Sequence, residues 1–185
     1  IGMKKAYLFL ADGFEEMEAT APIDFLRRAG VEAKMISITG SKQVAGSHGI
    51  QYTADALFEE TNLADADVLI LPGGMPGTKG LMAHKELAEA LIKHFAAGKL
   101  TAAICAAPMV LAGLGILDGK RATIYPGMEN MLQNSIVCFE GVVQDGNVIT
   151  ACGPGRAMDF AMVLVENLCG KRAAEKLRED TVYQR

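Results

Sequence analysis

The hydrophobic residues of this chain fall into short continuous runs, and a polar or amphipathic segment follows most of them. Runs at 5–11, 67–71 and 100–104 have the length and uniformly apolar character of buried strands. The pattern predicts further strands at 32–39, at 120–125 and at 147–152, a weaker extended stretch up to 53 and a hairpin region at 136–143. It predicts helices at 15–30, 85–97, 108–114 and 153–168, with a last charged helix after Gly170.

Two of the predicted helices have recognisable ends or faces. The helix at 15–30 has acidic residues in its first turn and basic residues in its last, which suits the helix dipole at both ends. Pro22 lies inside it and is expected to start a new helical turn or to kink the helix. The helix at 85–97 is amphipathic, and its predicted buried face consists of Leu87, Leu91, Ile92 and Phe95.

Apolar strands that alternate with helices indicate a mostly parallel sheet covered by helices on both faces. The expected fold is therefore a doubly wound, three-layer α/β sandwich. In such folds the ligand crevice lies at the carboxyl ends of the strands. We expect four loops that directly follow strands to meet there: Asp12-Gly13, Gly73-Gly74, Cys105 and Gly153-Pro154-Gly155.

Length and composition limit the classes of function. The 185 residues contain no repeat or linker, so we expect a single domain over 3–185, with Ile1 and Gly2 as a remnant of the expression vector. The formal net charge of -4 offers no basic surface, and neither nucleic acid nor a membrane surface is an expected partner. The uncharged run 100–117 is interpreted as core, because a proline and two glycines interrupt it.

The cysteines and the N-terminus bear on the cellular compartment. The four cysteines, at 105, 138, 152 and 169, form no CxxC pair and no Cys/His cluster. This spacing argues against a structural zinc site and against a disulfide framework, so no metal is expected. The N-terminal run has acidic residues directly after it and is no secretory signal. A reducing cytoplasm is the predicted location.

Cys105 stands where a predicted strand turns into a predicted helix. Small residues follow it, and Pro108 occupies a first-turn position. A sharp strand-to-helix turn holds its corner side chain above the sheet edge and directs free backbone N–H groups at the same place, as in a nucleophile elbow. The helix N-terminus would favour a thiolate there. The alternative interpretation is that Cys105 is a buried small hydrophobe.

Five motifs occur in register along the chain: ADGFEEMEA at 11–19, LPGG at 71–74, AAICAAP at 102–108, YPG at 125–127 and GPG at 153–155. Together they resemble the ThiJ/PfpI (DJ-1) superfamily, in its ThiJ-like branch. The resemblance implies a flavodoxin-like sandwich, a homodimer and a reactive cysteine at a strained elbow.

The resemblance also implies roles for particular residues. It identifies Cys105 as the reactive cysteine, Glu18 as the acid beside it, and the backbone N–H groups near Gly74 and Ala106 as an anion site. A protonated carboxyl group in a closed pocket can donate a hydrogen bond to a thiolate, which lowers the pKa of the thiol and raises its own. The alternative for Glu18 is a solvated acid on a helix face, the interpretation given to Glu15 and Glu16.

The chain departs from some relatives at two positions near the implied site. Tyr125 occupies the position of a histidine, and a tyrosine cannot act as a base at neutral pH. His48 occupies the position of an arginine that reaches the pocket from the partner subunit. The further candidates for lining the pocket are Gly73, Cys152, Gly153 and Pro154.

The branch's activities include glutathione-independent conversion of methylglyoxal to lactate and removal of early glyoxal adducts. The resemblance therefore predicts a cysteine-dependent glyoxalase or deglycase, with a small carbonyl substrate and no cofactor. The alternative is an oxidation-sensing or chaperone-like stress protein that uses the same cysteine without turnover. Peptidase and amidotransferase functions need a histidine base beside or after the cysteine. All three histidines precede Cys105, and Ala106 follows it, which argues against both.

Overall fold

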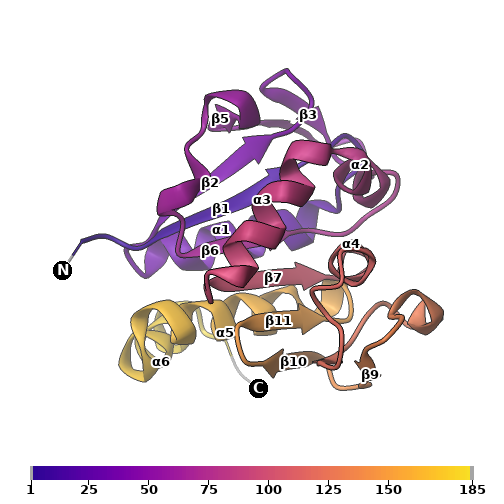
Figure 1. Ribbon diagram of the computed structural model, residues 1–185. Coiled ribbons are helices and arrows are strands. Elements are labelled where there is room, and N and C mark those ends of the chain that lie inside the picture. The colour runs from indigo at the N-terminus through magenta and orange to yellow at the C-terminus, as the bar shows by residue number, and fades with distance from the viewer. Residues whose placement is uncertain (1, 184–185) are drawn as a thin grey trace.

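The computed structural model describes residues 2–183 and has a seven-stranded sheet with helices on both faces (Figure 1). The strand order is β10-β11-β7-β6-β1-β2-β5. Every neighbouring pair is parallel except β10 with β11, which form an antiparallel hairpin at one edge. The bounds of these strands are Lys5–Leu10 (β1), Glu32–Ser37 (β2), Ala56–Leu57 (β5), Val68–Leu71 (β6), Leu100–Ile104 (β7), Val142–Asp145 (β10) and Val148–Ala151 (β11).

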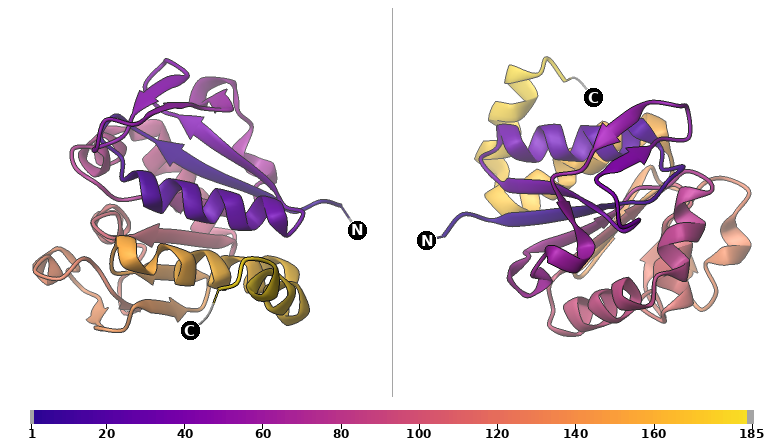
Figure 2. Two further views of the ribbon diagram at one scale, coloured as in Figure 1. Left: turned by 180° about the vertical axis from the view of Figure 1, so that it is seen from behind. Right: turned by 90° about the horizontal axis from the view of Figure 1, so that it is seen from above.

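The helices divide between the two faces of the sheet. One face is covered by α1 (Glu16–Arg28), α5 (Ala157–Cys169) and α6 (Lys171–Asp180), and the other by α2 (Gly77–Ala83), α3 (Lys85–Ala96) and α4 (Pro108–Gly113). The left view of Figure 2 shows α1 and α5 side by side on the first face. Because side chains alternate along a strand, β1 sends Leu8 and Leu10 into the α1 layer and Tyr7 and Phe9 into the α3 layer. The predicted flavodoxin-like sandwich is confirmed.

Two small two-stranded sheets lie outside the main sheet. β3 (Gln43–Ala45) pairs with β4 (Gln51–Thr53) in an antiparallel hairpin, and β8 (Arg121–Ala122) pairs with β9 (Ile136–Val137) in parallel. Short 3-10 turns cover Phe58–Glu60, Leu63–Asp65, Glu129–Met131 and Pro154–Arg156. Among residues 2–183, no helix is long and apolar enough to cross a membrane.

The structure corrects three details of the prediction. The strand expected at 120–125 is reduced to β8, because the chain then crosses the end of β7, where the Tyr125 N–H donates to the Cys105 carbonyl at 2.9 Å. Ile92 is 46% exposed, since the buried positions of α3 follow Leu87 at intervals of four and seven residues. The segment 136–143 forms no hairpin of its own, because its first strand, β9, pairs with β8 and the strand that begins at Val142, β10, pairs with β11. Helix α1 continues through Pro22 to Arg28.

Candidate functional site

The candidate site lies at the carboxyl ends of four neighbouring strands. β11, β7, β6 and β1 are adjacent in the sheet and parallel, so the segments that follow them emerge at one edge. Cys105 follows β7, Gly73-Gly74 follow β6, and Gly153 follows β11, as the order of the apolar runs predicts. Helix α1 brings Glu18 to the same edge, where its carboxyl group meets the Gly73 backbone.

Cys105 forms a strained corner between β7 and α4. Its φ is 67°, a left-handed conformation that side chains other than glycine rarely adopt. Two backbone hydrogen bonds hold it: its N–H donates to the Ala151 carbonyl at 2.8 Å, and its carbonyl accepts from Tyr125 N–H. The backbone N–H groups of Ala106 and Gly74 favour the thiolate, but burial outweighs them and the net pKa of the thiol is raised. The residue is only 8% exposed. This geometry is that of the nucleophile elbow expected from the sequence.

Glycine is required beside the thiol because the backbone passes very close to it. A Cβ on Gly73 would lie 2.7 Å from both the Cys105 Cβ and the Glu18 Oε1 atom. Gly74 has a φ of 90°, and a Cβ there would collide with the Glu15 amide. The two glycines therefore let the loop after β6 close over the Cys105–Glu18 pair.

Glu18 is fully buried and holds one hydrogen bond from the protein. Its Oε1 accepts from the Gly73 N–H at 3.0 Å, whereas Oε2 has no hydrogen-bond partner among residues 2–183. Burial raises the pKa of Glu18 to about 7, against the lowering effect of the Cys105 thiol and the Gly73 N–H, and the negative charge of Glu15 adds to the effect of burial. A proton on this carboxyl group belongs on Oε2, because Oε1 already accepts an N–H. Glu18 is therefore no solvated helix-face acid.

The pKa of the Cys105 thiol is raised, which contradicts the expectation that the helix N-terminus alone would favour a thiolate. Burial raises it to about 12, and the Glu18 carboxylate acts in the same direction. Burial is the first cause of both raised pKa values, and at Cys105 the Glu18 charge adds to it, so the pocket disfavours two negative charges at once. Cys105 and Glu18 thus behave as a coupled pair that loses one proton near neutral pH and retains the second. When the remaining proton is on Glu18, Cys105 is the anion.

Glu15 and Glu16 are buried, which overturns their interpretation as solvated acids. Glu15 caps α1, because its Oε2 accepts from the Glu18 N–H at 3.1 Å. Glu16 accepts hydrogen bonds from the backbone N–H groups of His48 and Ile50 and from the Ser47 hydroxyl. Burial would raise its pKa, but the bonds from the His48 ring and from backbone N–H groups outweigh burial and lower it to about 2.

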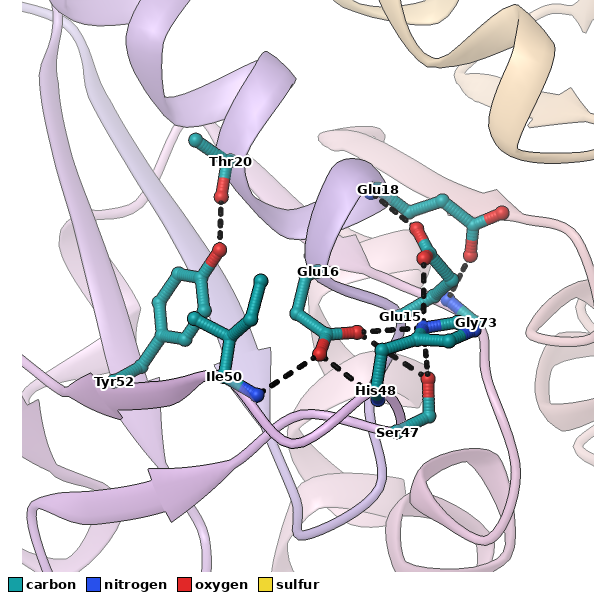
Figure 3. A network of polar contacts seen from close by, with 9 residues as sticks. All are labelled: Glu15, Glu16, Glu18, Thr20, Ser47, His48, Ile50, Tyr52 and Gly73. Carbon is teal, nitrogen blue, oxygen red and sulfur yellow. Dashed lines mark hydrogen bonds and ion pairs between the residues drawn. The ribbon is translucent and has the colours of Figure 1, made fainter.

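His48 lies over these two carboxylates at the tip of the β3–β4 hairpin (Figure 3). Its Nδ1 is 3.0 Å from the Glu16 Oε1 and 3.5 Å from the Glu15 Oε1, and its side chain is 71% exposed. The hydrogen bond to Glu16 raises the pKa of His48. These three side chains come close enough together to suggest cation binding. Since Glu16 already accepts four hydrogen bonds, we assign them no metal.

The remaining sequence candidates lie around the mouth of the site. Tyr125 is 46% exposed, and its ring lies 3.5 Å from where a Cβ on Gly153 would be. The Cys152 backbone neighbours that of Cys105, but among residues 2–183 its thiol has no hydrogen-bond partner. Pro154 lines a separate hollow of about 690 Å³ between α1 and α5. His94 is bonded through Nε2 to the Leu100 carbonyl at 2.8 Å and belongs to the core.

The fold and the site together define a class of protein: a mostly parallel α/β sandwich with a cysteine at a strained elbow and a buried glutamate beside it. Comparisons with known proteins identify the family. The chain matches the DJ-1/PfpI family over residues 4–167 and belongs to that family. Protein dj-1beta of Drosophila melanogaster is 40% identical over 178 residues, covering 95% of this chain and 94% of the relative.

Two further comparisons bear on function and fold. A protein named as a deglycase, from Pyrococcus abyssi, is 34% identical over 82% of this chain and 91% of its own length. The crystal structure of Drosophila melanogaster DJ-1beta has a TM-score of 0.96 at 35% identity and full coverage of both chains. That of oxidized Toxoplasma gondii DJ-1 has a TM-score of 0.95 at 34% identity, covering 98% of this chain and all of that one.

Proposed function

We propose that this chain is a glutathione-independent enzyme of the glyoxalase or deglycase type. Its substrates would be small 2-oxoaldehydes such as methylglyoxal, or the early adducts that these form. The observation that carries the proposal is the buried Cys105–Glu18 pair, which unites a nucleophile and a proton carrier in one pocket. The deglycase name of the Pyrococcus abyssi relative supports the same type of chemistry. A peptidase or amidotransferase is disfavoured, because no histidine lies beside the thiol among residues 2–183.

The proposed reaction begins from the form in which Glu18 has the proton. The Cys105 thiolate adds to the aldehyde carbon, and the N–H groups of Gly74 and Ala106 stabilise the oxyanion that forms. Glu18 gives its proton to this oxyanion, which completes the hemithioacetal and leaves Glu18 as a carboxylate. The carboxylate then takes the proton from the former aldehyde carbon and returns it to the neighbouring carbon through an enediol, while the hydroxyl proton passes to the oxygen of that neighbouring carbon, and a thioester results. Water hydrolyses the thioester, and hydroxy acid and free thiol result. This sequence needs no metal or organic cofactor.

The test is lactate production from methylglyoxal in the absence of glutathione. We expect wild type to turn over, and Cys105→Ser and Glu18→Gln to lose activity by at least about 100-fold. Cys169→Ser is the matched control, because Cys169 lies beside the Ala29 carbonyl, far along the chain from the site. Absence of turnover in wild type, or activity that survives Cys105→Ser, would refute the proposal.

The second candidate function is oxidation sensing by Cys105. It is supported by the relative from Toxoplasma gondii whose structure was determined in an oxidized form. The N–H groups that would stabilise an oxyanion would equally stabilise a sulfinate. Peroxide treatment followed by mass spectrometry tests this role. We expect Cys105 to oxidise before Cys169, and equal oxidation of all four cysteines would exclude a specific sensor.

We also infer that two copies of the chain associate, and that the chain works in the cytoplasm as a single domain. The hollow between α1 and α5 is lined largely by apolar groups, and the exposed Met17 and Met158 flank it. Its remaining lining includes Asp24 and Arg28, which form an ion pair. Light scattering tests the association, with Met158→Asp expected to give monomers. A wild-type monomer at micromolar concentration would exclude it. Cell fractionation tests the location.

A further inference from the structure

Glu15 links the two groups that hold Glu18 in place. Its backbone N–H donates to the Gly73 carbonyl at 2.9 Å, and its Oε2 accepts from the Glu18 N–H at 3.1 Å. Gly73 in turn donates its own N–H to the Glu18 Oε1. The Glu18 backbone and carboxyl group are therefore both held within one ring of contacts that closes through Glu15.

Glu15 also contributes a second carboxylate to this buried region. Its side chain is about one-tenth exposed, and it lies one helical turn from a carboxyl group that is fully buried. Two negative charges in one poorly solvated region repel each other, so the charge of Glu15 favours the protonated form of Glu18. The direction of the raised pKa of Glu18 agrees with this argument.

His48 is the cationic group that can oppose this effect. The other titratable groups facing this region are Glu16 on α1 and Cys105 on the elbow, and neither provides a positive charge. Asp12, at the end of β1, instead accepts a hydrogen bond from the Ala45 N–H. Glu16 holds the His48 backbone and ring in place, and the exposed ring can exchange protons with solvent.

We propose that Glu15 is a positioning residue that keeps the proton on Glu18, and that the charge on His48 adjusts how strongly that proton is held. This inference rests on the role given to Glu18 in the proposed function. Protonated His48 partly neutralises Glu15 and weakens its effect on Glu18. Neutral His48 leaves the Glu15 charge unopposed. Loss of the His48 proton therefore strengthens the hold of Glu18 on its own proton.

The proposal predicts opposite effects for two substitutions. Glu15→Gln keeps an oxygen that can cap α1 but removes the charge, and it should lower the pKa of Glu18 by about one unit. His48→Gln removes the opposing positive charge and should raise it. Glu15→Asp, which restores the charge, should return the Glu18 pKa towards its wild-type value. A purely structural role for Glu15 would not produce shifts of opposite sign.

The Glu18 pKa is measured directly by a pH titration of its side-chain carboxyl carbon by ¹³C NMR, with the resonance assigned by its absence in Glu18→Gln. The rate at which iodoacetamide alkylates Cys105 is the second readout. This rate should fall about tenfold in Glu15→Gln at neutral pH, because a smaller fraction of the molecules has the proton on Glu18 and the thiolate at Cys105. Both readouts are independent of turnover, so an inactive wild type would refute the proposed function without deciding this inference.

The outcomes separate clearly. Shifts of opposite sign for Glu15→Gln and His48→Gln would support the proposal. An unchanged Glu18 titration in Glu15→Gln would overturn it, and so would shifts of the same sign in the two variants. If Glu15→Gln does not fold, His48→Gln still decides, because that side chain is exposed and an unchanged Glu18 titration in it would refute the adjusting role.

Discussion

Gly73→Ala would test whether the close approach of the loop after β6 is what assembles the site. The added Cβ would lie 2.7 Å from the Cys105 Cβ, 2.7 Å from the Glu18 Oε1 and 2.8 Å from the Ile104 carbonyl oxygen. Ordinary carbon contacts begin at about 3.5 Å, so these groups must move apart by about 1 Å. The Cys105 Cβ and the Ile104 carbonyl are fixed by the elbow and by β7, and the Glu18 carboxyl end can move only by giving up its hydrogen bond from the Gly73 N–H.

Gly73→Ala is expected to lower both the stability of the fold and the rate of turnover. Overpacking of a well-packed interior costs about 1–3 kcal/mol, and about 1 kcal/mol lowers the melting temperature of a protein of this size by roughly 2–4 °C. A displacement of about 1 Å between reacting groups costs about 100-fold in rate. We therefore expect turnover of methylglyoxal to fall about 100-fold while the melting temperature falls by several degrees.

The assays are differential scanning fluorimetry and lactate production, each compared with Gly113→Ala. Gly113 ends α4, and a Cβ added there would meet nothing within 4 Å beyond its own helix, so its substitution should leave both measurements close to wild type. A Gly73→Ala protein with wild-type melting temperature and wild-type turnover would refute the steric argument. A large stability loss with normal turnover would show that the loop can move without disturbing the Cys105–Glu18 pair.

Three further predictions concern the carboxyl groups of α1. In Glu18→Gln, loss of the negative charge should lower the pKa of Cys105, as measured by thiolate absorbance at about 240 nm, and an unchanged titration would contradict the coupling. The raised pKa of Glu18 means that the folded state binds more protons than the unfolded state between pH 4.5 and about 7. The contribution of Glu18 to the free energy of unfolding is therefore complete below pH 4.5 and declines by roughly 2–4 kcal/mol as pH rises through 7. Urea titrations at several pH values should show this decline in wild type and not in Glu18→Gln. The lowered pKa of Glu16 acts in the opposite direction: its contribution is present above pH 4.5 and is lost as pH falls towards 2, and Glu16→Gln should be less stable at pH 7 but lose less on acidification.

Much of the fold follows from local patterns that the sequence displays directly. A buried parallel strand is apolar on both faces, so β6 and β7 stand out as short uniform runs, and β7 spans the predicted residues 100–104. The proximity of Cys105 to Gly73 then follows from the topology, because β7 and β6 are parallel neighbours and their carboxyl ends lie at the same edge of the sheet. The segment 120–125 differs from these runs. Ala122 and Ile124 alternate with polar residues as in a strand and pack into the α3–α4 layer, but only Arg121 and Ala122 form one.

The partners of the α1 carboxylates could not be predicted in the same way. Glu16 is separated by more than 30 residues from Ser47, His48 and Ile50, and no local period links a helix start to a hairpin tip. Only the resemblance to the family, carried by five motifs in the expected order and spacing, identifies Glu18 from the sequence. The spacing of Glu15 and Glu18 is that of a helix cap and the third residue after it, which is a signal for the capping role of Glu15.

The contrast between Glu16 and Glu18 shows what determines the chemistry of this site. Both are buried glutamates in the first turn of α1, yet their pKa values lie near 2 and near 7. Burial opposes the charged form in both, and it acts more strongly on Glu18, which is fully enclosed, than on Glu16, which lies beneath the exposed His48 ring. Glu16 accepts hydrogen bonds from two backbone N–H groups, a hydroxyl and the His48 ring, whereas Glu18 has the Gly73 N–H and the Cys105 thiol as partners. The depth of burial and the number of donors together decide which glutamate is a permanent anion that holds the β3–β4 hairpin and which can hold or release a proton beside Cys105.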